Sequence, residues 1–197
     1  ALRQRQMCIR DRNRLTSPLI SQLARSAMSG VHESKGQQTW LDYGLPDLRS
    51  LDRALRSCAL EEVLAGKDIA DAVDIVASNL GITDSTCPQV CIDSPLGRVL
   101  IQRTTLGHIV EKRQDARERY VKFALDTLTG PLEIWRVAYS DGSARLAFIG
   151  AYETKRQMLV VVNIQAGNVL WNFMQTDAKA LNKHRHGELL YKRYQLL

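Results

Sequence analysis

The chain has 197 residues, of which 45% are hydrophobic, 24% charged and 6% aromatic, and its formal net charge is +6. This length supports one good core with an appendage rather than two large domains. No apolar run approaches the roughly 20 residues needed to cross a membrane. Ordinary Gly and Pro contents exclude collagen-like and wholly disordered chains. We therefore predict a soluble globular protein.

The charge is unevenly distributed. Residues 1–30 carry +5, residues 31–97 carry −6 and residues 98–197 carry +7. A polyanion would dock on the basic C-terminal half, because neutralising phosphates releases counterions; scattered solvated side chains are the alternative. The acidic middle segment is either an internal mask over the basic half or a linker. We expect these three segments to be a tail with one helix, a helical linker region and an α+β domain.

The first half predicts mainly helices. Met7 to Arg12 resemble a translated sequencing-library adapter, so we leave about residues 1–12 out of functional reasoning; a natural basic arm is the alternative. A hydroxyl cap and Pro18 start a helix that Gly30 ends. A polar linker, a short helix over 46–55 and a helix over 67–80 follow. Last comes a hairpin whose turn is Ser-Pro-Leu-Gly.

In the second half of the chain, the spacing of the apolar residues changes. Helical patterns over 106–110 and 116–128 are stopped by Gly130-Pro131. Strand-like runs joined by short turns follow, at 134–139, 146–152, 158–164 and 169–174, and then a short helix at 178–182 and a last segment at 189–191. Short turns favour antiparallel neighbours. The predicted fold class is α+β, with helices packed on one face of a four-stranded antiparallel sheet, preceded by a mainly helical N-terminal segment.

The cysteines suggest no disulfide framework or metal site. Cys87 and Cys91 form a C-x3-C pair, but no second pair or histidine doublet stands at zinc-finger distance. The other two cysteines of the chain are Cys8 and Cys58. We expect reduced thiols, no bound metal, no cofactor and a cytoplasmic protein.

A set of motifs resembles a known family. They are His108-Ile109-Val110, Arg117-x-Arg119-Tyr120, Thr127-Leu128-x-Gly130-Pro131-x-Glu133-Ile134-Trp135, Leu159 to Val162, Thr176-Asp177 and Arg185-x-Gly187-Glu188-Leu189-Leu190-Tyr191. Together they resemble the phage-associated branch of the barnase–EndoU–colicin–RelE nuclease superfamily, as at the C-terminus of Mu-like phage head-morphogenesis proteins and in some bacterial toxins. The resemblance implies a nuclease-like domain over 98–197. It also implies a metal-independent endoribonuclease whose RNA lies against an open sheet face.

Metal-free RNA cleavage needs a base for the 2′-hydroxyl, an acid for the 5′-oxygen and cations for the phosphorane. His108 could be base or acid, with Lys112 one turn away, or it could simply pack against the sheet. Arg117 and Arg119 lie two apart on a predicted helix, so they point different ways. We prefer Arg117 for the phosphate and keep Arg119 as an RNA contact.

The strand over 169–176 and the basic residues after it supply further candidates. Strict alternation places Leu170, Asn172, Met174 and Thr176 on one face. Asn172 would then contact the RNA and Thr176 would join His108, Arg117 and Arg185 as a catalytic residue, although Thr176 could instead cap the next helix. The family pattern singles out Arg185, which could hold a phosphate bidentately. RNA contacts are also predicted for Lys112, Lys155, Lys183 and Tyr191. Trp135, Trp171 and Tyr152 could offer stacking surfaces, although aromatic residues on strands more often lie in the core; a basic edge with Tyr191 in the core is the alternative.

These patterns leave two functions open. The first is an RNA-cleaving phage or toxin effector that acts on transfer or single-stranded RNA in the bacterial cytoplasm, with a small acidic immunity protein as a possible partner. The second is a non-catalytic C-terminal domain of a head-morphogenesis protein that binds nucleic acid or capsid proteins and associates with the virion. Neither function involves a membrane.

Overall fold

A computed structural model describes residues 30–84, 86–165 and 167–195. Residues 33–197 form one compact unit, and every element named below belongs to it. The helix predicted between Pro18 and Gly30, the adapter-like residues and Cys8 lie outside the described residues. Within the described ranges, each helix is too short or too polar to cross a bilayer.

The helices begin where the sequence offers caps. The Asp68 carboxylate accepts the Asp71 N–H at the start of one helix, and the Asp177 carboxylate accepts the Ala180 N–H at the start of another. The helical elements are η1 (Arg53–Leu55), α2 (Ile69–Asn79), α3 (Arg103–Val110), η2 (Arg113–Asp115), η3 (Arg117–Tyr120), α4 (Val121–Thr129) and α5 (Ala178–Asn182). The helix predicted over 116–128 is therefore a 3₁₀ turn followed by α4.

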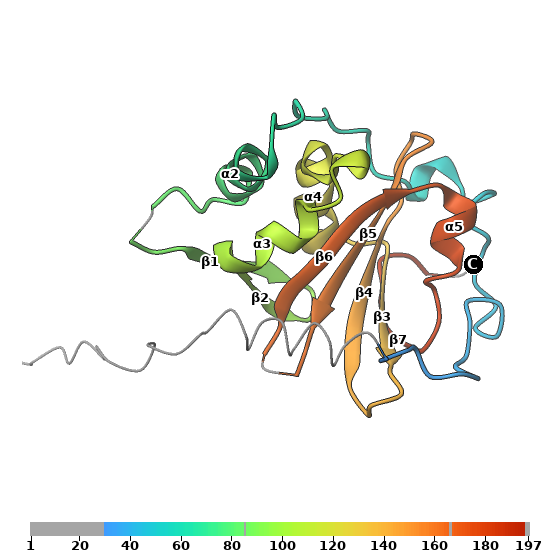
Figure 1. The fold of residues 1–197 in the computed structure, drawn as a ribbon. Helices are drawn as coiled ribbons and strands as arrows, with labels where there is room; N and C mark the ends of the chain where they lie inside the picture. Colours follow the sequence, from blue (N-terminus) through green and yellow to red (C-terminus); the bar gives the residue numbers. More distant parts are fainter. Residues whose placement is uncertain (1–29, 85, 166, 196–197) are drawn as a thin grey trace, which may run out of the picture. The chain divides into compact units, whose positions relative to one another are not determined.

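The described strands form one seven-stranded sheet in the order β1-β2-β6-β5-β4-β3-β7 (Figure 1). They are β1 (Gln89–Ser94), β2 (Gly97–Gln102), β3 (Glu133–Ala138), β4 (Ala144–Gly150), β5 (Gln157–Asn163), β6 (Val169–Thr176) and β7 (Glu188–Lys192). The antiparallel β1–β2 hairpin is as predicted.

The predicted fold class is wrong in the size and kind of the sheet. Strands β3 to β6 do pair antiparallel with one another, but the sheet continues on both sides of them. The hairpin joins through a parallel contact between Leu100 of β2 and Val169 of β6, and β7 pairs with β3. The result is a mixed, curled sheet. Local turn signals could not show these pairings, because both join segments far apart in sequence.

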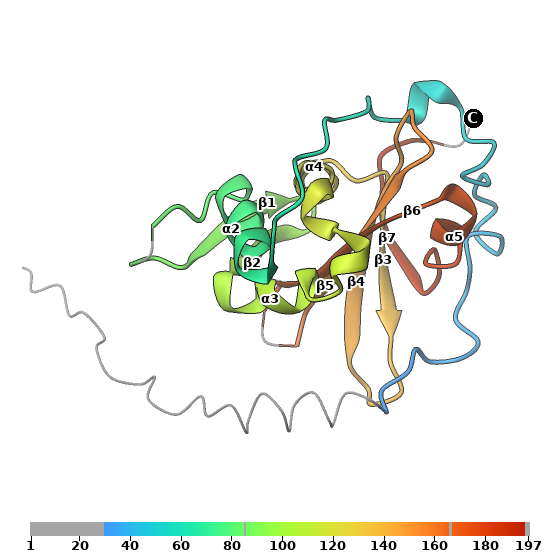
Figure 2. The same ribbon diagram turned by 45° about the horizontal axis from the view of Figure 1, so that its top comes forward.

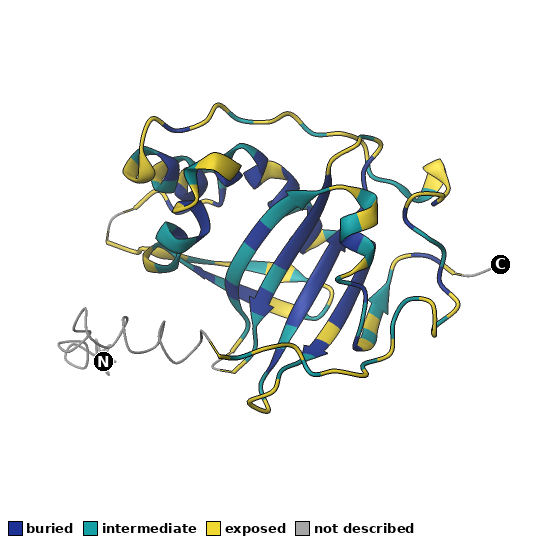
Figure 3. Ribbon diagram, turned by 45° about the vertical axis from the view of Figure 1, so that its right-hand side comes forward, coloured by how far each residue is buried: buried dark blue, intermediate teal, exposed yellow. Residues whose placement is uncertain are grey.

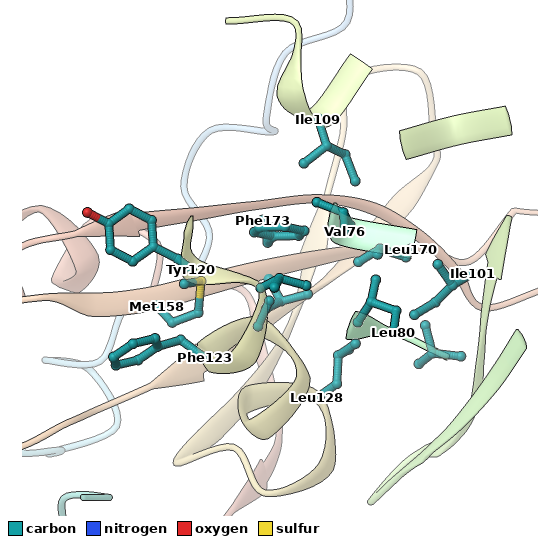
Figure 4. Close-up of a cluster of buried hydrophobic side chains, with 14 of the residues drawn as sticks. Val76, Leu80, Ile101, Ile109, Tyr120, Phe123, Leu128, Met158, Leu170 and Phe173 are labelled. Carbon is teal, nitrogen blue, oxygen red and sulfur yellow. The ribbon is translucent and has the colours of Figure 1, made fainter. Parts of the chain in front are cut away.

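The helices α2, α3 and α4 cover one face of the sheet, and Figure 2 shows them grouped on that side. Their apolar side chains meet those of the strands in the first core (Figure 4). Its members include Val76, Leu80, Ile101, Ile109, Tyr120, Phe123, Leu128, Met158, Leu170 and Phe173. Helical periodicity predicted this packing correctly for α4, because its apolar residues recur along one side. For α2 it is right for Val76 and wrong for Ile69, which is exposed at the start of the helix.

A second core covers much of the opposite face. Its members include Leu45, Leu48, Leu51, Leu132, Trp135, Val137, Ile149, Leu159, Leu181 and Tyr194. The strands β3, β4 and β5 contribute their side of this core. The segment before η1, α5 and the end of the chain pack on it through Leu45, Leu48, Leu51, Leu181 and Tyr194. The open sheet face that the resemblance implied is therefore reduced to the part around β6, which Figure 3 shows as largely half-buried.

The segment predicted as a helix over 46–55 folds as turns and the short η1. The Arg56 guanidinium donates to two carbonyl oxygens of this segment, those of Leu48 and Leu51, and to the carbonyl oxygen of Tyr152. The leucines still share one side, where they pack on the sheet. Their spacing is compatible with a helix, but tertiary hydrogen bonds replace the helical ones.

Candidate nucleic-acid interface

Strand β6 contains an irregularity that changes which of its side chains face the first core and which face the opposite side of the sheet. The pairing of β5 with β6 shifts between Val161 and Val162. As a result, Leu170 and Phe173 both enter the first core, while Asn172 and Met174 lie opposite Val161 and Leu159. The predicted alternation is therefore wrong for Leu170. One extra residue, as in a β-bulge, re-aims the strand at this point.

His108 lies beside this irregularity. Its Nε2 contacts the carbonyl oxygen of Trp171, and its ring centroid lies 5.0 Å from that of Trp171. A carbonyl oxygen can only accept, so Nε2 carries the proton and Nδ1 is the ring's basic atom in the neutral form. His108 can therefore pack against the sheet and still transfer a proton through Nδ1.

Arg117 reaches the same strand. Its guanidinium donates to the Asn172 side-chain oxygen at 2.9 Å and to the Asp115 carboxylate at 2.8 Å. Ala116, which precedes it, has φ +40° and ψ +51°, a left-handed conformation that costs a non-glycine residue energy. This turn directs the mostly buried Arg117 toward β6, so a predicted catalytic residue and a predicted RNA contact, Asn172, are in direct contact.

Arg145 of β4 was missed by the sequence analysis. Its guanidinium lies 4.4 Å from the ring centroid of Tyr139 and 5.1 Å from that of Trp171, which are cation–π distances. The signal was a single cation in an otherwise apolar strand.

A group of titratable side chains adjoins Arg145. His184, His186, Tyr139, Arg145 and Glu33 line a cavity of about 20 Å³, enough for about one water molecule. His186 Nε2 lies 3.0 Å from a Glu33 carboxylate oxygen. This bond raises the pKa of His186 and lowers the pKa of Glu33. Burial lowers the pKa of His184 and raises that of Tyr139.

We call the side chains connected in this way the polar row. It consists of His108, Arg117, Asn172, Trp171, Arg145, Tyr139 and His184. It combines imidazoles, guanidinium groups, an amide and a half-buried tryptophan. These are the groups that bind phosphates, stack bases and transfer protons.

Arg185 lies elsewhere. Its side chain is 0% exposed and forms an ion pair at 2.6 Å with the equally buried Glu133. Its guanidinium also donates to the carbonyl oxygen of Pro46 and to Asn182. Trp135 and Tyr194 donate to the same Glu133 carboxylate. The structure therefore places the fully buried Arg185 beside the second core.

The remaining predicted residues are spread more widely. Thr176 and Lys155 line a surface pocket at the far end of β6, about 13 Å along the strand from Asn172 at the usual rise per residue. Arg119 forms an ion pair with Glu62 at 2.6 Å. Lys112 and Lys183 are exposed, and Tyr191 packs against the first core. Among the described residues, no group of three or more His, Cys, Asp or Glu side chains could hold a metal ion.

The polar row thus places imidazole and guanidinium groups beside a half-buried aromatic ring, a set of groups typical of proteins that bind phosphates. The chain belongs to the family described as phage-Barnase-EndoU-ColicinE5/D-RelE like nuclease 2, whose model matches residues 76–192. This confirms the suspected superfamily and makes the chain a member of a nuclease-like family. A search of the curated proteins and a search of the solved structures found no match. The match covers residues 76–192, and so includes the hairpin and the whole polar row.

Proposed function

We propose that the chain is a metal-independent endoribonuclease, a phage or toxin effector domain that binds RNA over the polar row. The observation that carries the proposal is the contact of Arg145 and His108 with the same Trp171 ring in a chain of this nuclease-like family. A base stacked on Trp171 would bring its phosphate to these two side chains.

The proposed reaction uses these side chains as follows. A 2′-hydroxyl attacks its own 3′-phosphate, the bond to the 5′-oxygen breaks, and a 2′,3′-cyclic phosphate forms. Arg145 stabilises the phosphorane charge. Arg117 holds β6 through Asn172 and binds the neighbouring phosphate of the RNA. His108, which contacts Trp171, and His184, which lines the same cavity as Arg145, transfer the two protons. The lowered pKa of His184 keeps that imidazole neutral near pH 7, which suits a base.

The partners follow from the same surface. We propose single-stranded or transfer RNA as the substrate, with Lys155 and Thr176 binding a nucleotide beyond the cleavage site. The net charge of +7 over residues 98–197 supports a polyanionic partner. An acidic immunity protein, phage head proteins and a location in the bacterial cytoplasm or the virion stay predictions.

The test is cleavage of total bacterial RNA by the full chain in EDTA. We expect products with 2′,3′-cyclic ends and a rate that falls as salt rises. His108→Ala and Arg145→Ala should each lower the rate by about 100-fold or more. Arg98→Ala, which removes an exposed guanidinium in β2, is the matched control and should leave the rate unchanged.

Three outcomes would count against the proposal. Cleavage that needs magnesium would exclude the metal-free mechanism. Full activity in His108→Ala and Arg145→Ala would exclude the polar row as the site. A folded protein that binds RNA without cutting it would support the non-catalytic binding domain instead.

A further inference from the structure

A carboxylate of the chain's own N-terminal segment lies against the basic groups of the polar row. Glu33 forms an isolated bridge with Tyr139 after the end of β3, and its carboxylate bonds His186. It lines the same small cavity as Arg145 and His184. Both of these side chains also contribute to the lowered pKa of Glu33. A single anion thus lies near a guanidinium and two imidazoles.

The geometry of this group suits a phosphate better than a structural carboxylate. The cations come from β4 and from the loop after α5, so they converge from different elements on one point. Glu33 itself is 44% exposed at its side chain, in contrast to the fully buried Glu133. An ion pair exposed to this degree adds little stability. An exchangeable anion can therefore replace its carboxylate at small cost.

The segment that carries Glu33 is held mainly by its backbone and by Gln37. The Ser34 N–H donates to the Ala138 carbonyl oxygen at 2.9 Å, and the Gln37 side chain bonds both the N–H and the carbonyl oxygen of Ala138. These contacts do not depend on the Glu33 charge. A change at Glu33 should therefore alter the anion site without releasing the segment.

We propose that the Glu33 carboxylate occupies a phosphate-binding site formed by Arg145 and the imidazoles of His184 and His186, and that an RNA phosphate competes with it there. The inference rests on the proposed function for the identity of the ligand. It makes the N-terminal segment an internal competitor, so the affinity for RNA depends on how often Glu33 leaves the site.

The experiment measures binding separately from cleavage. The probe is a fluorescent single-stranded RNA with 2′-O-methyl groups, which lacks the attacking hydroxyl. Its Kd is measured by anisotropy for the full chain, for Glu33→Gln and for Asp42→Asn. Asp42 is an exposed carboxylate that bonds Thr39 in the same region, so its variant controls for the loss of one negative charge.

We expect Glu33→Gln to bind the probe at least about fivefold more tightly than the parent chain, at the lower end of typical coupling energies. Asp42→Asn should stay close to the parent chain. Equal Kd values for the two variants, or weaker binding by Glu33→Gln, would overturn the inference. A second variant, Glu33→Ala, should bind as tightly as Glu33→Gln.

Cleavage of unmodified RNA by the same proteins keeps the two proposals apart. If Glu33→Gln binds the probe more tightly but neither it nor the parent chain cleaves RNA, the phosphate site is supported and the proposed reaction is overturned. Cleavage by the parent chain with unchanged binding by Glu33→Gln supports the reaction and overturns the inference about Glu33.

Discussion

Two ion pairs formed by neighbouring residues of one loop differ in almost every physical respect. Arg185 pairs with Glu133 in the second core, where both side chains are 0% exposed. His186, the next residue, pairs with Glu33 at the edge of the polar row, where the side chains are 16% and 44% exposed. The Glu133 carboxylate also accepts hydrogen bonds from Trp135 and Tyr194.

This difference separates charges that build the fold from charges that a ligand can use. A buried ion pair is tolerated only when its remaining polar atoms are satisfied, and losing one partner strands a charge in the core. A partly exposed pair exchanges with water or with another ion. The arginine is therefore structural, and the two flanking histidines belong to the candidate interface.

The largest expected effect comes from breaking the buried pair. Arg185→Ala should lower the free energy of unfolding by about 3–5 kcal/mol, because Glu133 would remain buried without a countercharge. Denaturant unfolding followed by circular dichroism would measure it. Arg136→Ala, which removes an exposed arginine paired with Glu188 at 3.6 Å, is the control and should cost less than about 1 kcal/mol. A similar small loss for Arg185→Ala would contradict the structural role.

The smallest expected effect concerns the pair at the edge of the polar row. The raised pKa of His186 adds stability that is complete below its unfolded pKa of about 6.5 and is lost as pH rises through the folded pKa. The lowered pKa of Glu33 adds stability that is lost as pH falls through its own folded pKa. The lowered pKa of His184 opposes this, because its protonation disfavours the folded state.

The pH dependence can be isolated with His186→Gln. We expect the variant to be less stable than the parent chain by up to about 1 kcal/mol near pH 6, and the difference to shrink by pH 9. Burial raises the pKa of Tyr139, so its hydroxyl stays neutral over this range and does not mask the difference. Chemical unfolding at both pH values measures the difference. A difference that grows with pH would contradict the assigned pairing.

Local patterns predicted the elements well and their assembly poorly. The hairpin of β1 and β2 and the apolar side of α2 follow from turn residues and period. The parallel contact of β2 with β6 joins residues 69 positions apart, Leu100 and Val169, and nothing local marks it. The irregularity opposite Val161 and Val162 is likewise invisible to an alternation rule, because it depends on the partner strand.

The candidate site was predicted in part for the same reason. His108, Arg117 and Asn172 were chosen from the sequence, and the structure places them around one strand. Arg185 was chosen for its chemistry, but its direction depends on the buried Glu133. Arg145 was passed over because an isolated charge in a strand gives no sign of the two aromatic rings beside it.

The most direct measurement of whether the polar row binds RNA is hydrogen–deuterium exchange of the full chain with and without the 2′-O-methyl RNA. We predict slower exchange in residues 103–117, 139–145, 169–176 and 183–187. Residues 89–102 of the hairpin serve as the internal reference and should be unaffected. Slower exchange confined to the hairpin, or no change anywhere at saturating RNA, would contradict the assignment of the polar row as the nucleic-acid interface.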